Sequence, residues 1–237
     1  MNCLHRQNMK YELILFDLDG TLLDTSPGVF NSVRYALKEY GLPSISEDML
    51  SEFVGPPPKT MYMKLFNVNE ETALGLAKKH REYGKTKAIN EANEYPYIRD
   101  TLEMLRFEGY KLGVATLKSQ IIAETILDKF DLSRYFDIIV GMDNNESLTK
   151  MDTINIACKM LGVNGNILMI GDSVHDYNGA LEAGIDFLGV LYGFGFSPYD
   201  ELRDYEAIGF CENPSQIIET LRKNSITSSR LNNELQN

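Results

Sequence analysis

Apolar runs alternate with polar turns along most of the chain. The run 13–16 contains no polar position, and it is directly followed by an acidic, glycine-containing turn. Five further segments share this character, and they span residues 111–116, 136–141, 167–171, 186–191 and, more weakly, 207–211. Short continuous apolar runs bounded by turn residues are typical of strands that are buried on both faces. The pattern therefore predicts a parallel sheet.

Helical periodicity occupies most of the intervals between these runs. Apolar residues recur every three or four positions in residues 101–108, 121–130, 152–161 and 177–183. Strands that alternate with helices form a parallel sheet with helices on both faces and right-handed crossovers. We predict a doubly wound, Rossmann-like α/β core made of residues 11–25 and 96–223.

Strand patterns are missing between residues 26 and 95. Helical spacing dominates there, in segments 29–40, 47–53, 60–65 and 70–83. An all-helical insert after the first strand is expected to lie over the carboxyl ends of the strands, which is where open α/β sheets bind ligands. We therefore predict a helical cap at residues 26–95.

The charge and the cysteine content of the chain limit the binding partners and the cellular compartment that we expect. The formal net charge is -11 and the pI is about 4.8, which argues against nucleic acid or an anionic membrane, because both are held by basic patches. Cys3, Cys158 and Cys211 have no paired spacing, so reduced thiols in a cytoplasmic protein are expected. Oligomeric state stays open. The polar ends, residues 1–10 and 224–237, are predicted to be a disordered leader and a loose tail.

Two acids, Asp17 and Asp19, follow the first predicted strand directly. Residues two apart in an extended segment lie on the same side. One carboxylate can attack phosphorus to give an acyl phosphate, and the other can protonate the leaving oxygen and later deprotonate water. The turn at Gly20 and Thr21 is expected to present backbone amides to phosphate oxygens. A turn that merely ends a strand is the structural alternative.

Single polar residues at other predicted strand ends and helix starts supply further candidate groups. Thr116 can donate to a phosphoryl oxygen, and the amide of Leu117 can be a second donor at a helix start. Lys150 precedes a helix and can neutralise both a nucleophilic carboxylate and the phosphate that it attacks. Lys118 is a nearby competitor for this role. Each residue also has a structural explanation when it is considered alone: Thr116 as a cap and Lys150 as a solvated surface charge.

A second acidic pair, Asp172 and Asp176, follows the apolar run 167–171. Carboxylate oxygens are the ligands that Mg²⁺ prefers. We expect Asp172 to bind the metal directly, and Asp176 to act through water or by orienting the other ligands. Two unpaired acids at a buried strand end would repel one another without a cation. His175 lies between them but has no role in this chemistry.

In order and spacing, these pieces resemble the motifs of the haloacid dehalogenase superfamily of phosphatases. The pieces are the stretch Asp17-Leu18-Asp19-Gly20-Thr21, Thr116, Lys150 and the stretch Gly171-Asp172-Ser173-Val174-His175-Asp176. The helical insert resembles the α-helical cap of the phosphoglycolate-phosphatase-like branch. The resemblance implies Asp17 as nucleophile, Asp19 as general acid and base, and Mg²⁺ bound by Asp17, Asp172 and the backbone carbonyl of Asp19. It also implies that the Gly-rich stretch 191–195 belongs to the family pattern.

The expected activity is Mg²⁺-dependent hydrolysis of a small phosphomonoester, phosphoglycolate-phosphatase-like. A 5′-nucleotidase or sugar-phosphate phosphatase of the same mechanism is the first alternative. A phosphomutase is less favoured, because mutase relatives usually carry Val in place of Thr21, and a non-catalytic binding module comes last. Specificity is expected from the cap, where the Pro-rich turn could bring Gly55 or Lys59 toward the site. A plain Pro-rich connection between helices explains that turn equally well.

Overall fold

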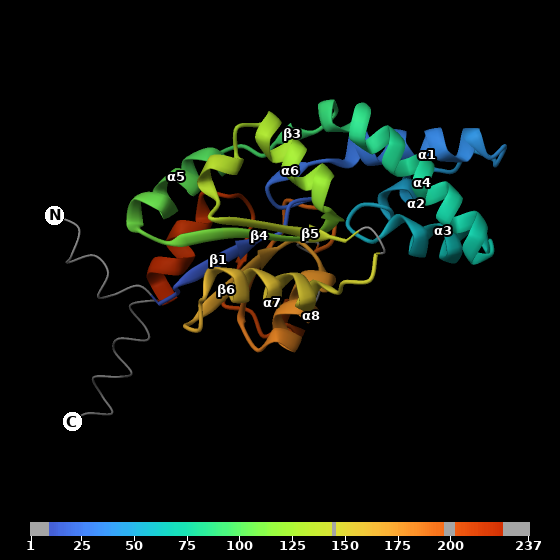
Figure 1. Cartoon of the computed structure of the whole chain (residues 1–237). Coiled ribbons are helices and arrows are strands. Elements are labelled where there is room, and N and C mark those ends of the chain that lie inside the picture. The colour runs from blue at the N-terminus through green and yellow to red at the C-terminus, as the bar shows by residue number, and fades with distance from the viewer. Residues whose placement is uncertain (1–9, 144–145, 197–201, 225–237) are drawn as a thin grey trace, which may run out of the picture.

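The computed structural model describes residues 10–143, 146–196 and 202–224 (Figure 1). The predicted leader and tail lie outside these residues, except for Lys10 and Asn224. The described residues contain a six-stranded sheet with the strand order β5-β4-β1-β6-β7-β8, in which every pairing is parallel. Its strands are β1 (Leu13–Phe16), β4 (Lys111–Ser119), β5 (Ile138–Met142), β6 (Ile167–Gly171), β7 (Asp186–Val190) and β8 (Phe210–Cys211). The predicted parallel sheet is confirmed, although β4 is longer than expected and β8 is only a short edge strand.

Helices cover both faces of this sheet, which confirms the doubly wound α/β architecture. They are α5 (Ile98–Glu108), α6 (Gln120–Lys129), α7 (Lys150–Leu161) and α8 (Val174–Ala183). In Figure 1, α5 and α6 lie on one side of the sheet, and α7 and α8 lie on the other. Short 3-10 turns occur at η3 (Ser133–Tyr135) and η4 (Leu202–Asp204), and residues 216–224 are helical.

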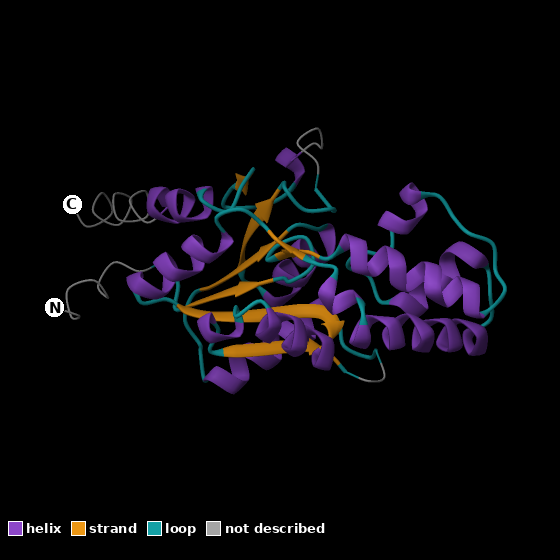
Figure 2. Ribbon diagram, turned by 90° about the horizontal axis from the view of Figure 1, so that it is seen from above, coloured by secondary structure: helices purple, strands orange, loops and turns teal. Residues whose placement is uncertain are grey.

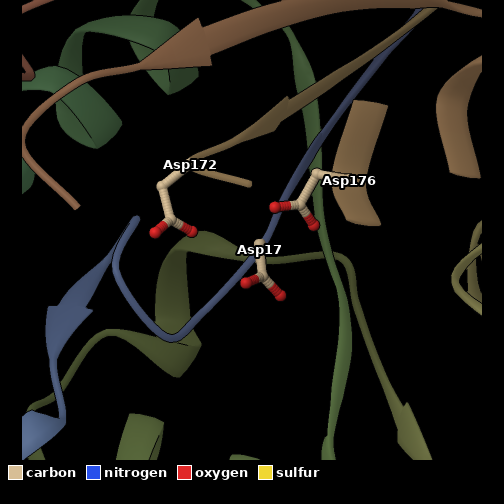
Figure 3. A group of neighbouring side chains, drawn as sticks. All are labelled: Asp17, Asp172 and Asp176. Atoms are coloured by element: carbon tan, nitrogen blue, oxygen red, sulfur yellow. The ribbon is translucent and has the colours of Figure 1, made fainter. Parts of the chain in front are cut away.

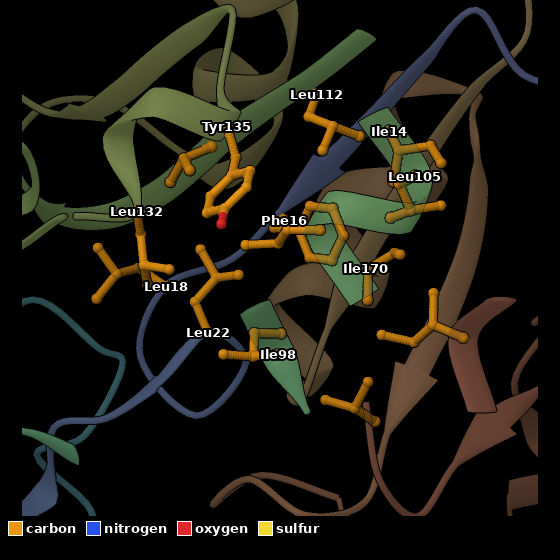
Figure 4. Packing of buried hydrophobic residues seen from close by; sticks show 14 of the residues in the cluster. Ile14, Phe16, Leu18, Leu22, Ile98, Leu105, Leu112, Leu132, Tyr135 and Ile170 are labelled. Atoms are coloured by element: carbon orange, nitrogen blue, oxygen red, sulfur yellow. The ribbon is translucent and has the colours of Figure 1, made fainter. Parts of the chain in front are cut away.

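The central strand β1 is buried on both faces, as its unbroken apolar run predicts. Ile14 and Phe16 pack with α5 and α6 in one cluster, part of which is drawn in Figure 4, whereas Leu13 and Leu15 pack with α7 and α8 in another. All four side chains are fully buried. Successive residues of a strand point to opposite faces, so the four together secure both helical layers. This burial fixes the position of the residues that follow Phe16.

The insert is mainly helical and has a hydrophobic cluster of its own. Its helices are α1 (Ser26–Glu39), α2 (Glu47–Ser51), α3 (Pro58–Phe66) and α4 (Glu70–Thr86), followed by the turn η2 (Ala88–Asn90). Val33, Leu50, Tyr62 and Leu76 are fully buried among them. Figure 2 shows these helices beyond one end of the sheet. We propose that residues 26–95 form a separate cap domain.

The expectation of an all-helical insert needs one correction. The strands β2 (Leu23–Asp24) and β3 (Asn93–Glu94) pair antiparallel where the chain enters and leaves the insert. Two connections that run side by side can satisfy their backbone groups by pairing, which the helical periodicity of the insert does not reveal.

Among the described residues, no helix has the combined length and apolar character needed to cross a membrane.

Candidate active site

Three acids meet at the carboxyl ends of two paired strands. Asp17 follows β1, and Asp172 follows β6, which pairs with β1 so that Phe16 lies opposite Ile170. Asp176 belongs to the first turn of α8. All three acids are buried, and one carboxylate oxygen from each lies within 4.8 Å of the others. Figure 3 shows the three carboxylates near one another.

Lys150 places its ammonium group among these acids. Its Nζ atom lies 2.8 Å from Asp17 Oδ1 and 2.6 Å from Asp176 Oδ1, and it donates a hydrogen bond to the carbonyl oxygen of Ala115. Burial lowers the pKa of Lys150, but the charges of Asp17 and Asp176 more than offset it, so its pKa is raised above the usual value. Lys150 is thus the cation beside Asp17, whereas Lys118 lies elsewhere, beside Asp19.

The expectation that Asp172 and Asp176 are both unpaired is wrong for Asp176. Besides its ion pair with Lys150, Asp176 accepts hydrogen bonds from the amide and hydroxyl of Ser173 in a capping box that begins α8. The sequence contains the signal for this capping box, because Ser173 precedes an acid by three positions at a helix start. Asp176 therefore also stabilises α8.

The cluster carries more negative than positive charge. Burial, followed by the charges of the other acids, raises the pKa of Asp172 to about 8, and burial raises that of Asp17 to about 6 against the opposing effect of Lys150. Asp176 Oδ1 is buried, and among the described residues its partner is the ammonium group of Lys150. Three buried carboxylates and one buried ammonium group are an arrangement that a divalent cation would neutralise. The residues present fit such a cation.

The glycine-rich stretch after β7 holds Asp172 in place, a role that the sequence did not reveal. The amides of Phe194 and Gly195 donate to Asp172 Oδ2 at 2.7 Å and 3.1 Å. A Cβ atom added at Gly193 or Gly20 would overlap the Asp172 side chain, so both positions need glycine for the backbone to approach it closely. The Gly-x-Gly spacing after a strand was the available signal.

Asp19 is not one of the three clustered acids, although it lines the same cavity. Its Oδ1 atom accepts a hydrogen bond from the hydroxyl of Thr25 and lies 2.8 Å from Lys118 Nζ. Thr25 was not predicted, although a hydroxyl close behind the acidic turn was visible in the sequence. Because Asp17 and Asp19 have different partners, the structure gives the two acids different surroundings.

The predicted phosphate-binding amides of Gly20 and Thr21 are used within the turn itself. The Gly20 amide donates to Leu23 at 2.9 Å, and the Thr21 amide donates to Leu18 at 3.3 Å. A tight turn satisfies its own backbone groups first, which corrects the expectation that both amides face a ligand. The Thr21 hydroxyl instead lies 3.5 Å from Asp172 Oδ1.

The predicted helix start at Leu117 is also corrected. Thr116 and Leu117 both lie within β4, and α6 begins only at Gln120. The Leu117 amide is therefore not at a helix N-terminus. Thr116 is buried, and its Oγ1 atom accepts a hydrogen bond from the amide of Lys118. A shift in the β4–β5 register between Ala115 and Ser119 lengthens this strand end.

Two cavities adjoin these residues. The carboxylate cavity, of about 240 Å³, is lined by the three acids, Lys150, Asp19 and cap residues that include Gly55. The cap cavity, of about 100 Å³, lies between insert and core, and it shares Asp19, Gly55, Pro56 and Leu117 with the first. Lys118 lines the cap cavity, whereas Lys59 lines neither cavity and pairs with Glu70.

Comparison with known proteins identifies the family of the chain. Residues 14–190 match the model of the haloacid dehalogenase-like hydrolases. The chain belongs to this family. A 5′-nucleotidase of Pseudomonas aeruginosa is 33% identical over 90% of this chain and 96% of its own length. A phosphoglycolate phosphatase of Agrobacterium fabrum is 31% identical over 80% of this chain and 84% of its own length.

A solved structure carries the same fold. The crystal structure of a predicted phosphatase from Clostridium acetobutylicum superposes with a TM-score of 0.84 at 37% identity, and the match covers 90% of this chain and 99% of that one. The predicted resemblance to haloacid dehalogenase superfamily phosphatases is thereby confirmed. Because the chain belongs to this family and its relatives are named as phosphatases, this haloacid dehalogenase-like hydrolase is an enzyme of the phosphatase class.

The close approach of Gly193 to Asp172 gives a testable prediction for this haloacid dehalogenase-like hydrolase. Gly193→Ala should lower kcat/KM by roughly 10-fold or more, because the added methyl group displaces a carboxylate that must be held within about 0.5 Å. Steady-state kinetics and a thermal melt would measure this. Gly84→Ala is the matched control, since its added Cβ meets only the end of the Ile122 side chain. Unchanged kinetics in the Gly193 variant would contradict this role of the glycine.

Proposed function

We propose that this haloacid dehalogenase-like hydrolase cleaves a small phosphomonoester in a Mg²⁺-dependent reaction through an aspartyl phosphate on Asp17. The observation that carries the proposal is the division of labour at the end of β1. Asp17 lies 2.8 Å from Lys150 among the clustered acids, whereas Asp19 is held by Thr25 and Lys118 at the edge of the cap cavity. One acid is thus placed beside the charge that a phosphoryl group needs, and the other beside the space for a leaving group.

In the first step, a carboxylate oxygen of Asp17 attacks phosphorus, and the bond from phosphorus to the leaving oxygen breaks. Asp19, in its protonated form, gives its proton to that oxygen. The leaving group departs as a neutral alcohol. Lys150 stabilises the negative charge around Asp17, and buried Thr116 is a candidate hydrogen-bond donor to a phosphoryl oxygen.

In the second step, water attacks the phosphorus of the acyl phosphate, and Asp19 accepts a proton from that water. The bond between phosphorus and the Asp17 oxygen breaks, which releases inorganic phosphate and restores the Asp17 carboxylate. Asp19 is then protonated again for the next cycle. The ion pair with Lys118 gives the Asp19 side chain a defined position for both transfers.

Asp17 and Asp172 would hold the metal, with Asp176 close by and the backbone carbonyl of Asp19 as the further ligand that the family resemblance implies. Bound Mg²⁺ would supply positive charge for the phosphoryl oxygens. The hydrogen bonds from Phe194 and Gly195 orient Asp172 for this task. A small phosphorylated metabolite in the cytoplasm is the proposed substrate, with phosphoglycolate and nucleoside monophosphates as the candidates favoured by the named relatives.

Hydrolysis of p-nitrophenyl phosphate tests this function directly. We expect release of p-nitrophenol with Mg²⁺ and a loss of release with a chelator, because the three buried carboxylates need a cation. Restoring Mg²⁺ should restore the rate, which separates metal removal from denaturation. Activity that is indifferent to the chelator would contradict the metal dependence, and an absence of release at high substrate concentration would contradict the proposed hydrolysis.

A further inference from the structure

We infer that the cap cavity selects an uncharged leaving group of nucleoside type, and that Glu146 accepts a hydrogen bond from it. The inference rests on the proposed function, since the leaving group is the part of the phosphomonoester beyond Asp19. It distinguishes between the two substrate classes named above. A nucleoside has apolar ring faces and donates hydrogen bonds from its edges, whereas glycolate is small and anionic.

The charges that line the cap cavity balance among the described residues. Three are acidic and three are basic, namely Asp19, Asp143 and Glu146, and Arg81, Lys85 and Lys118. Arg81 pairs with Glu146, and Lys118 pairs with Asp19. Lys85 is exposed. A site for a carboxylate would be expected to carry excess positive charge, which this lining does not show.

His80 adds no charge to this lining. It is buried in α4, and its Nδ1 atom lies 3.4 Å from the hydroxyl of Tyr62. Burial, together with the charges of Lys118 and Arg81, lowers the pKa of His80 to about 3, so the ring is neutral at pH 7. Residues 78–87 are locally basic, a pattern typical of a solvated helix face, but His80, Arg81 and Lys85 line the cavity.

The side chain of Glu146 contains a hydrogen-bond acceptor, Oε2, to which no described residue donates. Its side chain is only 9% exposed, and its Oε2 atom has no hydrogen-bond partner within the described residues. A buried carboxylate oxygen without a partner is costly, so a ligand that supplies an N–H or O–H group gains from filling it. The carboxylate of phosphoglycolate is an acceptor at neutral pH and would be repelled by Glu146.

Apolar side chains form another part of the lining. Val29 and Phe53 come from the insert, Ile122 and Met142 come from the core, and the three prolines 56–58 complete this part. Apolar side chains beside an acceptor without a donor suit the flat rings and edge N–H groups of a base better than a hexose, which carries hydroxyl groups all around.

The first test compares substrates on the native enzyme with Mg²⁺. We expect kcat/KM for adenosine 5′-monophosphate to exceed that for phosphoglycolate and glucose 6-phosphate by roughly 10-fold or more, given one satisfied charged acceptor. Preference for either of the other two substrates would overturn the inference. Hydrolysis of p-nitrophenyl phosphate in the same preparation separates this outcome from a failure of the proposed function, since it reports the phosphoryl chemistry alone.

The second test replaces the acceptor. Glu146→Ala should lower kcat/KM for adenosine 5′-monophosphate by roughly 10- to 100-fold, mainly through KM, while p-nitrophenyl phosphate changes less than about 3-fold because its ring donates no hydrogen bond. Glu70→Ala is the matched control. It breaks the ion pair between Glu70 and Lys59, and neither of these residues lines either cavity. Equal losses with both substrates would show that the Arg81–Glu146 pair only holds the insert on the core, and would overturn the inference.

Discussion

Asp17→Asn is expected to abolish turnover, with a loss in kcat of roughly four orders of magnitude or more, as for other nucleophile replacements. The amide cannot attack phosphorus to form the acyl phosphate. No phosphoenzyme should therefore be trapped when the reaction with labelled substrate is quenched in acid. Because Asn keeps the size of Asp17 and can still accept a hydrogen bond from Lys150, a normal thermal melt would show that the chemistry, and not the fold, is lost.

The matched variant Asp19→Asn separates the roles of the two acids. It should slow turnover by roughly 100- to 10,000-fold, the usual contribution of a general acid and base, while some phosphoenzyme is still trapped. Asn keeps the size of Asp19, and Asp19 is not among the clustered acids, so the ion pair of Asp17 with Lys150 should be preserved. Equal residual activity in both variants, or trapping only in the Asp17 variant, would contradict the assignment.

Lys150→Met is expected to have the largest effect on stability. Removing the ammonium group leaves Asp17 and Asp176 buried without their counter-charge, which typically costs about 3–5 kcal/mol in the free energy of unfolding. Urea denaturation in a chelator would measure this loss. With saturating Mg²⁺ the loss should be smaller, since a cation bound to the native cluster replaces part of the missing charge and stabilises the folded state.

Lys118→Met provides the comparison for this stability measurement. Lys118 pairs with a single acid, and its side chain is 14% exposed, compared with 5% for Lys150. Its removal should therefore cost less. If Lys150→Met unfolds at the same urea concentration as the native chain, or if Mg²⁺ leaves the difference unchanged, the charge balance described for the cluster would be wrong.

The meeting of Asp17 and Asp172 was predictable because a parallel sheet brings the carboxyl ends of its strands to one edge. Apolar runs located β1 and β6, and each acid follows directly after its run. The pairing of Phe16 with Ile170 then places the two acids side by side. The alternation of strands and helices likewise predicted the doubly wound core, since local periodicity largely specifies such elements.

Hydrogen-bond partners were less predictable, because groups distant in the sequence compete for the same atoms. Nothing local shows that Asp172 accepts from Phe194, which lies 22 residues later. The Gly20 amide had an apparent ligand role, but the turn supplies its own acceptor at Leu23. Asp176 looked unpaired beside Asp172 until the approach of Lys150 supplied a partner.

By itself, the sequence determined the fold class, the order of the chemical groups and the family resemblance, because these depend on local periodicity and on motifs. The tertiary structure alone decided which side chains of the insert face the core. Lys59, the predicted candidate, pairs within the insert, whereas Arg81 reaches Glu146 across 65 residues of chain. The physical reason is that the orientation of a helix over a site depends on packing between distant segments, and its own periodicity reveals only which face is apolar.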